Sequence, residues 1–277
     1  DSQLLDPGIV EFSASYGIRS QLLSGERFYD EDDYYGSGFV RAGVLDNLTL
    51  GASFAFDDTG YLVGGEALLS TGFGLFGFDG LFSSLDGFDS GWIGRASYQG
   101  TFDVVNPADL LLLLSAEYQT EFYSGLGVIP VSSPLEMTYS GSFNYTIDED
   151  LAIFAGGQFS TYRDGSEDTW GINAGFAWRV TDDIQFRAAG TAERDDNGDM
   201  EYGVGLRITA RFGADQFASA SYDSINERAD ISWSRSPGIA TDSWEANASL
   251  SATPDAASFN GGVGYTSNRG VARLQHS

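Results

Sequence analysis

Strict alternation of apolar and polar side chains over long segments is the feature that most constrains this fold. In the segment 135–147, odd positions are apolar, aromatic or glycine, whereas even positions from Glu136 to Thr146 are polar. The segments 10–19, 170–179, 201–212 and 244–251 repeat this pattern. Successive side chains of a β-strand point to opposite faces, so a period of two predicts strands. About sixteen or seventeen such segments, each about ten residues long, predict an all-β protein.

The length of these segments distinguishes two settings for the strands. Strands of soluble proteins usually have about 5–6 residues, whereas strands that cross a bilayer need about 9–11. Aromatic residues lie toward the ends of the apolar faces, as in Trp170 and Trp178 or Tyr202 and Phe212. Such pairs match the aromatic girdles of outer-membrane barrels. We therefore expect a transmembrane antiparallel β-barrel in the bacterial outer membrane; a large soluble sheet or propeller is the alternative.

Composition excludes several functions. The formal net charge is −26, all 14 basic residues are arginine, cysteine is absent, and the single histidine is His276. Nucleic acid is disfavoured as a partner because its phosphates require a basic surface. Without cysteine there is no thiolate nucleophile, thiolate zinc site or iron–sulfur cluster. We expect neither an enzyme nor a cofactor.

The connections between segments alternate in length. The short ones are 45–47, 72–74, 148–150, 181–183 and 213–215, and the longer ones are 20–35, 84–91, 124–134, 163–168 and 193–200. The sixth, 104–109, is intermediate. Bacterial barrels have short periplasmic turns and longer external loops. The first strand is therefore predicted to run outward from the periplasm, and many carboxylates fall in external loops.

Several acidic clusters could bind a metal ion or act in catalysis, but a structural role explains each of them better. The cluster from Asp30 to Asp33 is oxygen-rich but lacks the spacing of a calcium loop, so no metal site is predicted. The segment 194–200 is predicted to be a tight turn around Gly198. Polar-face carboxylates could include an acid/base pair for glycoside chemistry. We expect Glu117, Glu121, Glu136, Glu193 and Glu201 instead to pair across strands with Arg187, Arg207 and Arg211.

The polar face mixes charged residues, amides, hydroxyls and glycine, as expected for a water-filled lumen. The predicted lumen-lining residues are Glu11, Arg19, Glu117, Gln119, Glu136, Asn144, Asn173, Arg179, Gln185, Arg187, Arg207, Arg211, Glu245 and Asn247.

The opening stretch resembles a known family. The segment 4–21, "LLDPGIVEFSASYGIRSQ", is followed by a glycine-rich pair of strands at 60–84. The order of these motifs resembles outer-membrane ushers of chaperone–usher pilus assembly, directly after their plug domain. The matching positions are Leu4, Leu5, Pro7, Gly8, Phe12, Ser13, Gly17, Arg41, Gly43, Val44, Leu48, Thr49, Leu50, Gly64, Gly65, Gly74 and Ser83. The match covers about the first 100 residues, and Gly51-Ala52-Ser53 stands where ushers usually have Tyr-Gly-Gly.

This resemblance implies a fold and a function. Residues 1–277 would form one transmembrane barrel domain, part of an usher barrel of about twenty-four strands, without the plug and the N- and C-terminal periplasmic domains. Its partners would be outer-membrane lipid, pilin subunits and the periplasmic chaperone that delivers them. The barrel would translocate the subunits and help assemble the pilus. The alternative is a self-contained porin of about sixteen strands that passes small solutes.

Overall fold

A computed structural model describes residues 4–23, 26–105, 108–127, 132–236 and 242–276. The side chains of 19–33 and 104–108 lie outside this description. The strands within these ranges are β1 (Val10–Leu23), β2 (Glu26–Leu45), β3 (Leu48–Asp57), β4 (Gly60–Thr71), β5 (Gly74–Leu85), β6 (Gly91–Val105), β7 (Ala108–Gln119), β8 (Leu135–Thr146), β9 (Leu151–Tyr162), β10 (Thr169–Thr181), β11 (Ile184–Arg194), β12 (Met200–Phe212), β13 (Gln216–Asp223), β14 (Arg228–Arg235), β15 (Ser243–Ala252), β16 (Ala257–Ser267) and β17 (Gly270–His276).

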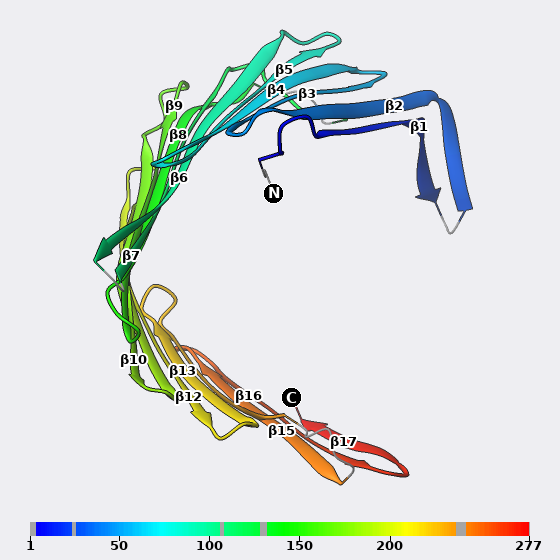
Figure 1. Ribbon diagram of the computed structural model, residues 1–277. Helices are drawn as coiled ribbons and strands as arrows, with labels where there is room; N and C mark the ends of the chain where they lie inside the picture. Colours follow the sequence, from blue (N-terminus) through cyan, green and yellow to red (C-terminus); the bar gives the residue numbers. More distant parts are fainter. Residues whose placement is uncertain (1–3, 24–25, 106–107, 128–131, 237–241, 277) are drawn as a thin grey trace.

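The strands form one antiparallel sheet in which each strand pairs with the next along the chain. Figure 1 shows this sheet curved into an open C, with β1 near one end and β17 at the other. No pairing joins β1 to β17 in the described part of the chain. The predicted all-β antiparallel fold, with 17 strands in these ranges, is confirmed.

The N-terminal segment of the chain identifies the two faces of the sheet. Residues 4–9 lie inside the curve, against β2 and β3 (Figure 1). The backbone N–H of Gly8 donates to the carbonyl of Gly43 at 2.8 Å, and the N–H of Leu5 donates to Oγ1 of Thr49 at 2.8 Å. The face that carries Gly43 and Thr49 is therefore concave. The printed register then assigns every second residue of each neighbouring strand to the same face.

The convex face is apolar and uncovered. Large side chains there are widely exposed, for example Phe12 at 78%, Tyr202 at 69% and Leu274 at 77%. From β3 to β17, and in the part of β2 that pairs with residues 10–18 of β1, convex positions of described register carry no Asp or Glu, and the arginines among them are Arg194 and Arg235, both at strand ends. The alternation predicted from the sequence thus corresponds to an apolar outside and a polar inside.

The sheet has almost no core. The buried apolar residues in the described ranges are Leu68, Leu85 and Ala246. A sheet in water normally buries its apolar face against a second layer of structure. Here no second layer of protein covers the convex face, so the exposed apolar area far exceeds the single patches typical of soluble monomers. Within the same ranges, no helix is long and apolar enough to span a membrane.

Several connections differ from those predicted. The loop expected at 20–35 is wrong: the hairpin of β1 and β2 continues through it, with Ser20 opposite Tyr29 and Leu23 opposite Glu26. The connection at 58–59 is a two-residue turn, although the predicted alternation of short and long connections requires a long loop at this place. The connections 120–134, 163–168 and 195–199 are long as expected. The sixth falls at 106–107, outside the described residues.

The turn around Gly198 is confirmed. Gly198 has a φ of 86°, which favours glycine. Oδ1 of Asp195 accepts hydrogen bonds from the N–H groups of Asn197 at 3.0 Å and Asp199 at 2.8 Å. The hydrogen bond from the N–H of Asp199, followed by the one from the side-chain amide of Asn197, lowers the pKa of Asp195. This carboxylate therefore organises the turn.

The N-terminal contact can be tested by filling the space above Gly43. A Cβ at this position would lie 2.2 Å from the carbonyl oxygen of Asp6, so residues 4–9 must move away in Gly43→Ala. We expect this variant to unfold in urea with a free energy lower by about 1–3 kcal/mol. Gly17→Ala is the matched control, since nothing lies within 4 Å of its Cβ position. Equal stability of the two variants would contradict this packing.

Candidate functional site: the concave face

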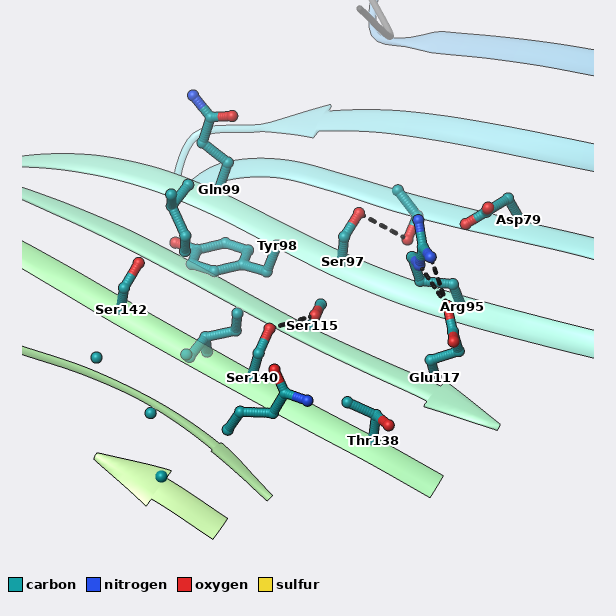
Figure 2. Close-up of a pocket in the computed structure, with 18 of the residues that line it drawn as sticks. Asp79, Arg95, Ser97, Tyr98, Gln99, Ser115, Glu117, Thr138, Ser140 and Ser142 are labelled. Atoms are coloured by element: carbon teal, nitrogen blue, oxygen red, sulfur yellow. Dashed lines mark hydrogen bonds and ion pairs between the residues drawn. The ribbon is translucent and has the colours of Figure 1, made fainter. Parts of the chain in front are cut away.

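The concave face carries a broad groove with a volume of about 1060 Å³. Its polar lining residues come from strands β4 to β11, and Figure 2 shows several of them pointing into it. Those on the concave face are Glu66, Asp79, Arg95, Ser97, Gln99, Ser115, Glu117, Thr138, Ser140, Ser142, Gln158, Asn173, Thr191 and Glu193. A surface with this mixture of short hydroxyls, amides and charges is well hydrated.

Short hydroxyl side chains form cross-strand pairs on this face. The Oγ atoms of Ser115 and Ser140 are 2.7 Å apart, and those of Ser219 and Ser232 are 2.8 Å apart. Opposite hydroxyls satisfy each other across an antiparallel pair, which stabilises the sheet modestly. Glycines continue the same rows, with Gly156 opposite Ser142 and Gly171 opposite Gln158. The middle of the face is therefore low in relief.

A row of charged residues crosses the first seven strands. Its members lie opposite one another in sequence from β1 to β7: Glu11, Arg41, Gly51, Glu66, Asp79, Arg95 and Glu117. Apart from Gly51, the row contains four carboxylates and two guanidinium groups, and each cation has a carboxylate on either side of it. It runs across the strands, as a band on the inner wall.

Arg41 is the centre of one half of this row. Its Nη1 lies 3.5 Å from Oε2 of Glu11, and its Nε forms an ion pair with Oε1 of Glu66. Glu66 lies two strands away, and Gly51 occupies the place between them. A Cβ at Gly51 would lie 2.6 Å from Cγ of Glu66, so glycine leaves the path that lets the two side chains meet. The side chain of Arg41 is only 16% exposed.

Arg95 is the centre of the other half. Its Nε donates to Oε2 of Glu117 at 2.9 Å, and its Nη2 contacts the same oxygen (Figure 2). Asp79 lies directly opposite Arg95 on the adjacent strand. A charge-assisted contact of this kind is stronger than one between neutral groups.

The described residues of the connection after β7, 120–127 and 132–134, contact the concave side of the sheet and the end of β9. The N–H of Ser124 donates to Oγ of Ser83 at 3.3 Å, and Ser83 is only 1% exposed. Arg163 holds the two ends of this connection through the carbonyls of Gln119 and Ser133. Burial, followed by the charge of Glu117, raises the pKa of Tyr123 in this loop. The loop therefore narrows the space above β5 and β6.

The structure places most predicted site residues on one face. Register puts Glu11, Glu117, Gln119, Asn144, Asn173, Arg179, Gln185, Arg187, Arg207, Arg211, Glu245 and Asn247 on the concave side. Glu136 lies at a bulge between Leu135 and Met137 and has no opposite residue. The side chain of Arg19 lies outside the described residues. That this face lines a lumen stays a prediction.

The ion pairs predicted across the strands are wrong, because the structure gives these charged residues other neighbours. Arg187 lies opposite Arg207, and Glu193 lies opposite Glu201, so like charges face each other. Glu117 pairs with Arg95, and Glu121 lies in the connection after β7 rather than on a strand. Period-two alternation predicts the face of a residue but not the register between strands, and register decides which charges meet.

Sequence reasoning missed four residues of the charged row: Arg41 as an ion-pair centre, Glu66, Asp79 and Arg95. A signal was present, because Glu66, Asp79 and Arg95 are isolated charges within long glycine-rich and apolar segments. A single charge at the centre of such a strand must face water or an opposite charge. In the described residues, no group of three or more His, Asp or Glu side chains could hold a metal ion.

A one-layer meander of long strands, apolar outside and polar inside, defines the wall of a transmembrane-type β-barrel. No family model matches the sequence, and no curated protein matches it either. Solved structures do match. One is an E. coli P pilus tip assembly intermediate of PapC, PapD, PapK and PapG, with a TM-score of 0.71 and 17% identity over 95% of this chain and 34% of that chain. Another is the P pilus usher (PapC) translocation pore, with a TM-score of 0.60 and 15% identity over 98% of this chain and 60% of that chain.

These matches show that the chain has the fold of an usher barrel portion. It spans about a third of one matched chain and three fifths of the other. The resemblance stated from the opening motifs is therefore confirmed at the level of fold.

A double-mutant cycle tests the charged row. We expect Arg41→Gln and Glu66→Gln to be coupled by about 1 kcal/mol in the free energy of unfolding, because their ion pair is largely shielded from water. The cycle of Arg41→Gln with Glu11→Gln should give less than about 0.5 kcal/mol, since Glu11 is half exposed and more distant. Urea unfolding in lipid vesicles measures both. Equal couplings would contradict the geometry of the row.

Proposed function

We propose that residues 1–277 form part of an outer-membrane usher barrel that translocates pilin subunits delivered by a periplasmic chaperone. The observation that carries this proposal is a hydrated, low-relief concave face on a sheet with the usher fold. Along β8 to β10, short hydroxyls, amides and glycines offer a passing protein few apolar anchors. A folded subunit could therefore move along this wall without being held.

The same proposal places the convex face in lipid. Most of its strands are long enough to cross a bilayer at a tilt, and its central band lacks carboxylates and arginines. The connections 86–90, 163–168 and 195–199 share one rim of the sheet and are rich in carboxylates. We assign this rim to the outside and the short turns, such as 182–183 and 213–215, to the periplasm.

The matched structures favour an usher over the porin alternative. The solved structures with this fold are described as a translocation pore and a pilus assembly intermediate. We propose no catalytic role for the concave residues.

Photo-cross-linking in the native host tests the function. A photoreactive residue replacing Ser140, on the concave face, should cross-link to a pilin subunit that carries its chaperone, since cargo passes this position. The same residue at Tyr139, on the convex face, should not. The absence of any pilin cross-link, together with steady conductance of small ions by the purified chain in a bilayer, would contradict the usher proposal and favour the porin.

Lipid exposure is tested by two adjacent arginine substitutions at the centre of β12. Leu206→Arg places a charge on the convex face, and we expect it to reduce the free energy of folding into vesicles by about 2–4 kcal/mol. Gly205→Arg is the control at the same depth, because Gly205 lies on the concave face with nothing within 4 Å of its Cβ position. Equal losses in both variants would contradict lipid contact on the convex side.

A further inference from the structure

Arginines without carboxylate partners gather on the concave face of β10, β11 and β12. They are Arg179, Arg187, Arg207 and Arg211, which we call the arginine cluster, and all four are exposed. Arg187 lies directly opposite Arg207. Arg179 is two residues along β10 from Ala177, the residue opposite Arg187, and Arg211 is four residues along β12 from Arg207. Four of the chain's 14 basic residues thus share three adjacent strands.

These arginines differ from the others on the same face. Arg41, Arg95, Arg228 and Arg273 each form an ion pair with a carboxylate of the chain. In the described part of the chain, no carboxylate lies within ion-pair distance of any member of the cluster. Asp230, whose charge acts on Arg207, is already held by Arg228. In the described residues the cluster is therefore a positive patch without ion-paired carboxylates, in a chain of net charge −26.

The surroundings of Arg187 and Arg207 leave their charges accessible to an external ligand. Like charges directly opposite on antiparallel strands destabilise the sheet, so the pair Arg187 and Arg207 lowers stability without an internal benefit. The guanidinium of Arg187 lies 4.2 Å from the ring centroid of Phe154, a cation–π contact that positions the side chain without neutralising it. A hollow of about 800 Å³ adjoins the pair and is lined by Arg187, Arg207, Ser221 and Asp223 among others. An external anion would relieve the repulsion and would have room to enter.

We propose that the arginine cluster binds acidic, extended segments of the polypeptide that passes along the concave face. Guanidinium groups pair with carboxylates in a planar, two-point geometry. Residues of one strand face that are four apart are separated by about 13 Å, so Arg207 and Arg211 match carboxylates four residues apart in an extended peptide rather than one compact anion. The cluster lies on the face opposite the proposed lipid surface, which excludes bilayer phosphates as its ligand. This inference rests on the proposed function in one respect only: it takes a polypeptide as the molecule that passes along the concave face.

Binding of a fluorescein-labelled hexaglutamate peptide to the full chain in detergent micelles tests the proposal. We expect saturable binding at low ionic strength that weakens as salt is added. Arg187→Gln with Arg207→Gln should weaken binding at least tenfold. The control is Arg228→Gln with Arg273→Gln, which removes the same charge from the same face but from arginines that are already paired; its binding should change less than threefold.

Stability provides a second measurement. Because Arg187 and Arg207 repel each other, Arg207→Gln should unfold at the same or a higher urea concentration than the unsubstituted chain, so weaker peptide binding cannot be ascribed to misfolding. Equal weakening in both double variants, no saturable binding, or displacement of the peptide by an equal concentration of inorganic phosphate would overturn the proposal. Peptide binding requires no subunit transport. A chain that binds the peptide but forms no pilin cross-link would fail as an usher while keeping its acidic-peptide site.

Discussion

The structure depends on one constraint: a single-layer sheet whose apolar face is covered by no protein. Only three apolar residues are buried in the described ranges, so the fold does not gain its stability from a core. Its backbone groups are satisfied by sixteen consecutive antiparallel pairings, and its convex side chains require an apolar medium. Strand length, the absence of carboxylates on the convex face and the aromatic residues near strand ends all follow from this requirement. We propose that lipid is this medium.

Within the strands, charged residues therefore lie mainly on the concave face, where they form two separate regions. The strands β1 to β7 carry a row in which carboxylates outnumber and neutralise two arginines, whereas β10 to β12 carry arginines that no internal carboxylate neutralises. Between them lies a zone of serine, threonine and glycine that is lined by few charges. The net charge of −26 is therefore unevenly placed: much of it lies in the rim connections, and the inner wall has an acidic half and a basic region. A passing protein would meet both.

Alternation in the sequence was sufficient to predict the fold class, the approximate number of strands and the face of twelve of the fourteen candidate residues. It could not predict which charges meet, because register depends on turn geometry and on pairing along the whole hairpin. Arg187 and Arg207 were expected to find carboxylates and instead face each other. The segment 20–35 was read as a loop because its carboxylates break the alternation, yet backbone pairing continues through it. The placement of residues 120–127 and 132–134 depends on Arg163 and Ser83, which are distant in sequence and gave no local signal.

The most direct test of the central claim uses the absence of cysteine from the chain, which makes single-cysteine labelling free of background. Cysteine would be placed in turn at each position from 203 to 209 of β12, and the protein in vesicles would be treated with a charged, membrane-impermeant maleimide. The account predicts rapid labelling at 203, 205, 207 and 209, which face water on the concave side, and strong protection at 204, 206 and 208, which face lipid. Uniform labelling along the strand, or the inverse alternation, would contradict it.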